Sequence, residues 1–127
     1  MQRAILAVIA GIVTWVVLAV GIDAGMSHFW PAYVVAKHTE IFNLDMMLAR
    51  LTESTVALVV AAVVAARVAP ASRLAPWAMG IVMLLIFIPV HYMVWDKFPI
   101  WYHAYFLSSL VLVSGVVGRW AQPGTRP

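Results

Sequence analysis

The stretch Ala4-Ile-Leu-Ala-Val-Ile-Ala-Gly-Ile-Val-Thr-Trp-Val-Val-Leu-Ala-Val-Gly-Ile22 contains no charged residue. Its length matches the roughly 20 apolar residues that a helix needs to cross the hydrocarbon core of a bilayer. A cleaved signal peptide has a shorter apolar core, about 7–15 residues, and a small-x-small site that the residues after Gly21 do not supply. We therefore expect a retained membrane-spanning helix at this position.

Three further apolar runs of similar length follow along the chain. Together the four runs predict helices at about residues 3–22, 45–68, 76–95 and 100–120. Proline-containing segments at 70–76 and 96–99 separate the last three. Both joints are short, so neighbouring helices should pack antiparallel.

The connection between the first two helices is longer, about residues 23–44, and its middle is apolar. The segment Pro31-Ala-Tyr-Val-Val-Ala-Lys37 predicts a short interfacial helix or a lid over the bundle. The predicted fold is thus all-α: one antiparallel four-helix transmembrane bundle over residues 1–127, with a short interfacial segment between helices 1 and 2.

The composition supports a membrane protein, since 65% of the 127 residues are hydrophobic and only 10% are charged. A soluble domain carries about 25% charged residues, so the excess apolar surface should face lipid. The sequence has no cysteine, which excludes disulfides and thiolate metal sites. The basic residues behind the net charge of +3 are scattered, and we expect no nucleic-acid partner.

The ionisable residues are divided between the two ends of the predicted bundle. One end keeps only arginines among its charges, namely Arg3, Arg67, Arg73, Arg119 and Arg126. The other end holds every acid and histidine: Asp23, Glu40, Asp45, Glu53, Asp96, His28, His38, His91 and His103. Because arginine and lysine in short loops stay cytoplasmic, we expect both termini in the cytoplasm and the end with the acids and histidines on the outer side of the membrane.

Three ionisable residues lie deeper in the helices than the rest. Antiparallel packing should bring Glu53, His91 and His103 into one layer, with Arg50 and Asp23 as neighbours. Ionisable groups at membrane depth are costly and usually face a bundle interior or a wet cavity. The others, His28, His38, Glu40 and Asp96, are expected to be solvated loop residues. We therefore take Glu53, His91 and His103, with their neighbours Arg50 and Asp23, as the candidate binding site.

Three interpretations of this layer stay open. The first is a structural polar network, in which Arg50 pairs with Glu53 at i,i+3 and the histidines bond across helices. The second is a divalent metal site of Glu53, His91 and His103, with a haem held by the two histidines as a variant. The third is a proton-coupled or small-ligand pocket open to the outside. We expect no cofactor, with a divalent metal as the alternative.

Small residues recur at helical spacing and predict close helix packing. The predicted seams are Ala7, Gly11, Thr14, Leu18, Gly21 and Gly25 on helix 1, Ala57, Ala61 and Ala65 on helix 2, and Ser114 and Gly118 on helix 4. They serve either packing within one bundle or association, as a homo-oligomer or within a larger membrane complex.

Catalysis has little support in the sequence. It contains no serine–histidine–aspartate order and no glycine-rich phosphate loop, and Ser54, Ser108 and Ser109 are expected to bond back to helix carbonyls. We therefore expect a non-enzymatic integral membrane protein, an accessory subunit or an oligomeric component. The alternative is a small transporter or a metal- or ligand-binding protein with an outward-facing pocket at Glu53, His91 and His103.

The stretch His91-Tyr-Met-Val-Trp-Asp-Lys-Phe-Pro-Ile-Trp-Tyr-His103, followed by a helix ending in Gly115-Val-Val-Gly118-Arg, resembles a group of small four-helix bacterial membrane proteins of uncharacterised function. The Phe98 to His103 turn and the element His28-Phe-Trp-Pro31 carry the resemblance. It implies a bacterial inner-membrane location and supplies no activity.

Overall fold

A computed structural model describes residues 1–124, which form five α-helices and one 3-10 turn with no strand among them. The elements are α1 (Gln2–Phe29), α2 (Pro31–Thr39), α3 (Leu44–Val68), α4 (Ala75–Met93), η1 (Trp95–Lys97) and α5 (Ile100–Ala121). By length and composition, α1, α3, α4 and α5 can each cross a membrane. The prediction of an all-α fold built on four long helices is confirmed. Arg126 lies outside the described residues.

The first long helix is longer than predicted. It was expected to end at Ile22, but α1 continues through Asp23 to Phe29. A single aspartate does not interrupt a helix, whereas a proline disfavours helical geometry in the residue before it. Trp30, which precedes Pro31, has φ −130° and ψ 84°, so the chain turns there and not at the first charged residue.

The predicted short helix between the first two long helices is present as α2. Pro31 occupies its first turn, where a missing N–H costs nothing. The helix ends at Glu40, whose φ of 57° is left-handed. Tyr33 and Ala36 are buried and form a small second core with Met46 of α3. This contact holds α2 against the end of the bundle.

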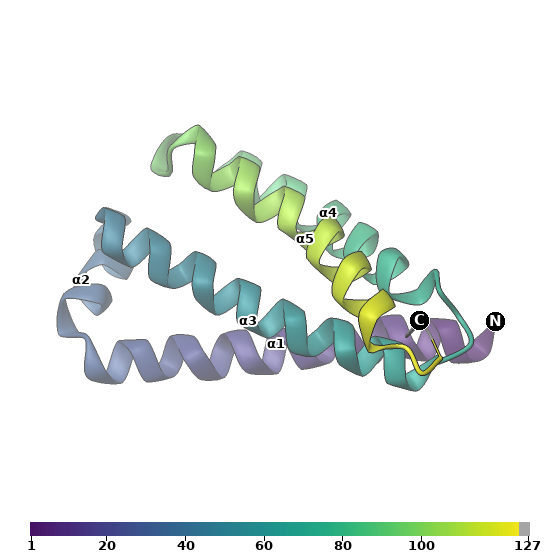
Figure 1. The fold of residues 1–127 in the computed structure, drawn as a ribbon. Helices are drawn as coiled ribbons and strands as arrows, with labels where there is room; N and C mark the ends of the chain where they lie inside the picture. The colour runs from purple at the N-terminus through teal and green to yellow at the C-terminus, as the bar shows by residue number, and fades with distance from the viewer. Residues whose placement is uncertain (125–127) are drawn as a thin grey trace.

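The four long helices form a ring in which α1 and α5 each pack against both α3 and α4. The chain reverses direction at each joint, so α1 is antiparallel to α3, and α4 is antiparallel to α5. The expected close pairing of the consecutive helices α3 and α4 is not the main contact, because these two lie diagonally across the ring. Figure 1 shows α5 beside α4 on one side and α3 beside α1 on the other.

Small residues allow close contact in the half of the bundle near the termini. Ala57, Ala61 and Ala65 of α3 are fully buried, which confirms this predicted seam. The seam on α1 is divided, however. A side chain at Gly11 would meet Met79 and the Ala61 carbonyl, whereas one at Gly21 would meet nothing within 4 Å. Only the first half of that seam therefore packs inside the bundle.

The two ends of the bundle differ in structure. Figure 1 shows the start of α1 and the end of α5 at one end of the bundle and α2 at the other. At the terminal end, the Gln122 amide donates a hydrogen bond of 2.7 Å to the Ser72 carbonyl, which joins the end of α5 to the loop between α3 and α4. At the α2 end, Lys97 of η1 forms an ion pair with Glu40. Glu40 lies in the turn after α2 and is exposed, as expected for a solvated loop residue, and this ion pair links it to the turn before α5.

Candidate functional site

A cavity of about 490 Å³ lies inside the bundle toward its α2 end. All four long helices contribute to its wall, and Lys37 of α2 lies at its margin. Its volume falls within the roughly 300–1,000 Å³ range of small-molecule sites. Of the five predicted site residues, Asp23, Arg50, Glu53 and His91 line it, and His103 does not.

The floor of the cavity is aromatic. The Trp15 and Phe87 rings meet edge to face with their centroids 5.2 Å apart, and the centroids of the Phe87 and Phe106 rings are 5.1 Å apart. These three are the lining residues of α1, α4 and α5 that lie farthest from the α2 end. Below them the core is filled by buried side chains such as Met83 and Leu110. The cavity therefore ends part-way across the bundle.

The cavity opens sideways between α1 and α4. Val20 of α1 and Val90 of α4 both line it, yet they are 65% and 44% exposed on the outside of the bundle. Residues that belong both to the cavity wall and to the outer surface of the bundle mark a mouth of the cavity. In a membrane the exposed faces of these helices meet lipid, so the mouth is bordered by apolar side chains.

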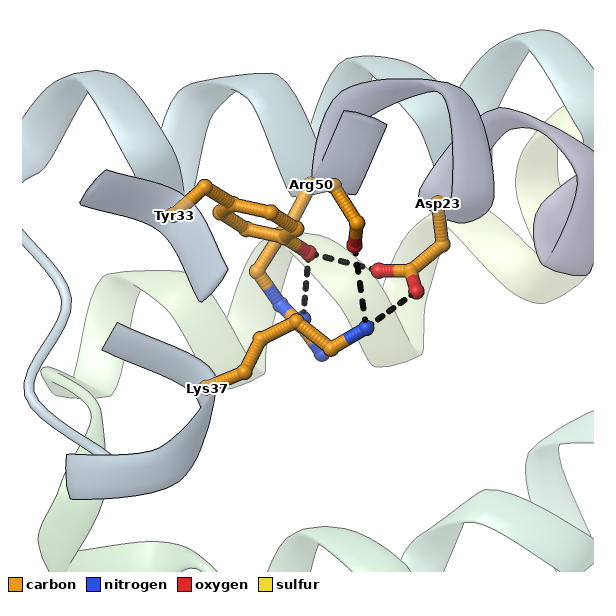
Figure 2. A network of polar contacts seen from close by, with 5 residues as sticks. Asp23, Tyr33, Lys37 and Arg50 are labelled. Carbon is orange, nitrogen blue, oxygen red and sulfur yellow. Dashed lines mark hydrogen bonds and ion pairs between the residues drawn. The ribbon is translucent and has the colours of Figure 1, made fainter. Parts of the chain in front are cut away.

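A network of Asp23, Tyr33, Lys37 and Arg50, here called the α2 clamp, lies at the α2 end of the cavity (Figure 2). The Tyr33 hydroxyl donates to Asp23 Oδ1 at 2.7 Å and accepts from Arg50 Nη1 at 2.8 Å. Lys37 Nζ pairs with Asp23 Oδ2 at 2.5 Å and donates to the Ser27 hydroxyl at 3.3 Å. The clamp joins α1, α2 and α3 through side chains.

Tyr33 is the central member of the clamp. Its side chain is fully buried. Burial raises the pKa of its hydroxyl, and the hydrogen bond donated to Asp23 raises that pKa further. The hydroxyl therefore stays protonated, and able to donate, at pH values below the ordinary tyrosine range.

The predicted Arg50–Glu53 pair does not form. Arg50 instead donates from Nη1 to Tyr33 and from Nε to the Tyr102 hydroxyl at 3.3 Å. Its guanidinium lies 5.0 Å from the centre of the Phe42 ring. The i,i+3 spacing permits the pair, but two tyrosines from other helices and an aromatic face give the guanidinium a better position. Spacing along one helix could not show these partners.

Glu53 is left in the cavity wall without a partner. Among residues 1–124, its carboxylate has neither a hydrogen bond nor an ion pair. The neighbouring Ser54 is only 5% exposed, and its hydroxyl also has no hydrogen-bond partner. It was expected to bond to a helix carbonyl, as Ser108 and Ser109 do. A carboxylate and a buried hydroxyl, both unsatisfied, thus line one side of the cavity.

His91 and His103 are brought together, as the sequence predicted. Their Nδ1 atoms lie 2.7 Å apart, and His103 Nε2 lies 3.2 Å from the Trp95 carbonyl oxygen. A carbonyl only accepts, so His103 Nε2 carries a proton and, in the neutral ring, its Nδ1 is an acceptor. His91 Nδ1 must then be the donor. The other ring nitrogen of His91, Nε2, is then an acceptor, and His91 lines the cavity.

The predicted metal site gains no support from this geometry. Within the described part of the chain, no three histidine, aspartate or glutamate side chains are grouped so as to hold a metal ion. The histidines use their facing nitrogens to bond each other, and Glu53 contacts neither of them through a hydrogen bond. The haem variant meets the same difficulty, since the rings lie too close to admit an iron between them.

Several important residues were not found from the sequence. The sequence analysis placed Tyr33 and Lys37 only in the interfacial segment, and it singled out none of Tyr102, Trp15 and Phe87 as site residues. One signal was present: Tyr33 and Lys37 stand at i,i+4 in a short apolar helix, so they share a face. The aromatic floor left no such signal, because its members come from three helices.

Comparison with known proteins found no match, since no family model fits the sequence and no curated protein or solved structure is significantly similar. The resemblance to small bacterial four-helix proteins stays a prediction.

Proposed function

We propose that this protein binds a small ligand from the membrane in the cavity between α1 and α4, as a membrane receptor or a small transporter. The cavity itself carries the proposal: about 490 Å³ of space is lined by an unpartnered carboxylate and an unpartnered buried hydroxyl. Polar groups at membrane depth cost free energy unless they are satisfied. A bound ligand would satisfy Glu53 and Ser54.

The shape of the cavity favours binding over free conduction. The aromatic floor and the filled core beneath it leave no polar path to the terminal end. We further propose that the α2 end faces outward in a bacterial inner membrane and that both termini are cytoplasmic. The arginines near the termini and the short α3–α4 loop support this orientation.

The cavity predicts saturable photolabelling by a membrane-soluble probe. Decanol with a diazirine on its chain should label cavity residues of α1 and α4 in protein reconstituted into phosphatidylcholine nanodiscs. Ala19→Trp places an indole in the cavity wall and should reduce this labelling about tenfold. Mass spectrometry of the labelled peptides, with competition by unlabelled decanol, measures the effect.

The matched control for this experiment is Ala24→Trp. Ala24 lies on the same helix but is exposed and outside the cavity wall, so its replacement should leave labelling unchanged. Labelling that is not saturable, or that survives Ala19→Trp at the level of Ala24→Trp, would rule out a ligand cavity.

A second candidate function, an accessory or oligomeric membrane component, is favoured by one observation. Side chains added at Gly21 and Gly25 of α1 would meet nothing within 4 Å, so this half of the small-residue seam is not used inside the bundle. In lipid, such glycines let two helices approach closely. The candidate is that α1 contacts another membrane protein or a second copy here.

If the α1 seam associates, Gly21→Leu should weaken association about tenfold, or about 1.4 kcal/mol. Single-molecule photobleaching of labelled protein in lipid bilayers counts the subunits. Val16→Leu is the control, because Val16 is an exposed residue of the same helix on another face than Gly21 and Gly25. Gly11→Leu is not suitable, since Gly11 packs inside the bundle. Equal subunit counts in all variants would remove this candidate.

A further inference from the structure

We infer that the ligand is an amphiphilic amine that enters from the lipid between α1 and α4 and places its ammonium group against Glu53. This inference rests on the proposed ligand cavity and specifies its substrate class. It follows from the charges, the hydrogen-bonding polarity and the shape of the cavity.

Among the charged groups that line the cavity, Glu53 is near Arg50 and Lys37 but forms no ion pair or hydrogen bond with either of them. Lys37 is paired with Asp23 at 2.5 Å. Arg50 has hydrogen bonds to two tyrosine hydroxyls and lies over the Phe42 ring. Both cations are thus held at the α2 end, whereas Glu53 has no bonded partner among residues 1–124. A cationic ligand neutralises this carboxylate, and an anionic ligand would lie beside it at a cost.

The hydrogen-bonding polarity of the wall around Glu53 agrees with a donor ligand, while the buried, unpartnered N–H donor of Trp15 belongs to the aromatic floor. The Glu53 carboxylate accepts hydrogen bonds, and so does His91 Nε2, because its Nδ1 is committed to His103. The Ser54 hydroxyl is able to accept as well. An ammonium group carries up to three N–H donors, so it can satisfy groups on both α3 and α4. A quaternary ammonium or an alkyl anion lacks these donors.

The aromatic floor suits the same ligand. Trp15, Phe87 and Phe106 offer ring surface to an alkyl chain, and aromatic rings at a desolvated site also attract cations. Glu53 and Ser54, which form the polar side of the cavity, lie nearer the α2 end than this floor does. They come before the closely packed part of α3 along the chain. The cavity is therefore polar on one side and mainly aromatic at its base, where Trp15 supplies one N–H, as an amphiphile requires.

The position of the mouth sets the route of the ligand. It lies between the exposed side chains of Val20 and Val90, on a surface that faces lipid, whereas the paired side chains of the α2 clamp lie at the other end of the cavity. A molecule already dissolved in the membrane reaches the cavity without crossing the clamp. This favours an amine with a hydrocarbon chain over a small hydrophilic one.

Competition against the photoreactive decanol tests the inference. Unlabelled decylamine, decanol and decyl sulfate are compared at equal mole fractions in phosphatidylcholine nanodiscs near neutral pH. In the wild-type protein, decylamine should displace the probe at a mole fraction about tenfold lower than decanol requires, and decyl sulfate should be the weakest. Glu53→Gln should abolish the preference for decylamine over decanol.

The control variant is Asp45→Asn, which removes an exposed carboxylate from the start of the same helix and should keep the full preference. If Glu53→Gln does not fold, the inference is still tested by the order in which the three competitors displace the probe from the wild-type protein and from Glu53→Asp. Decanol or decyl sulfate competing as well as decylamine would overturn the amine assignment but leave the cavity intact. A probe that none of the three displaces would overturn the ligand cavity itself.

Discussion

Replacing Gly80 by alanine is expected to lower the free energy of unfolding of the bundle by about 1–3 kcal/mol. A side chain at this position would collide with the Leu110 carbonyl and would lie 2.9 Å from the Val111 Cα. Both are backbone atoms of α5, so no rotation of a side chain can relieve the contact, and α4 and α5 must move apart. Unfolding in mixed micelles with increasing dodecyl sulfate, followed by tryptophan fluorescence, measures the loss.

Gly21→Ala provides the matched control for Gly80→Ala. It adds the same methyl group to a helix at a position with open space. Because glycine costs about 0.5–1 kcal/mol in a helix relative to alanine, this variant should unfold at the same or a higher free energy. If both variants were equally stable, close packing of α4 on α5 would not be a source of stability.

Tyr33→Phe is expected to weaken the docking of α2 by about 2 kcal/mol. The change removes the hydroxyl that donates to Asp23 and accepts from Arg50. Asp23 retains Lys37, and Arg50 retains Tyr102, so the loss is smaller than that of two complete hydrogen bonds to charged groups. Hydrogen exchange of the α2 amides should become about thirtyfold faster, with little change in α5.

Tyr92→Phe is the control for this change, since Tyr92 is 81% exposed and makes no hydrogen bond among the described residues. The pH dependence gives a second signature. The raised pKa of Tyr33 means that its contribution is fully present below the ordinary tyrosine value of about 10. The contribution is lost only as the pH rises through the higher folded value. Exchange rates of α2 that do not respond to Tyr33→Phe would show that the clamp does not hold the helix.

The long helices were predictable because their signals are local. A run of apolar residues long enough to span a bilayer, interrupted by proline, indicates a helix without reference to any other part of the chain. The predicted starts of α3 and α5 therefore fall at or next to the observed ones. The end of α1 was missed because Asp23 was taken as a boundary, whereas Pro31 supplied the actual stop.

Tertiary structure decided which polar groups meet. Glu53 and Arg50 share a helix at a spacing that permits a pair, and the sequence favoured that pair. The fold brings Tyr33 and Tyr102 to Arg50 from other helices and so leaves Glu53 in the cavity without a partner. Residues far apart in the chain compete for each polar group, and the spacing of residues along one helix does not indicate which of them will bond to it.

The sequence by itself determined that this is a chain of four apolar helices with its acids and histidines gathered at one end, because hydropathy and helix breakers act over a few neighbouring residues. Only the tertiary structure decided the ring order of the helices, the sideways mouth between α1 and α4, and the unsatisfied carboxylate inside it. These features depend on how side chains from several helices fill shared space.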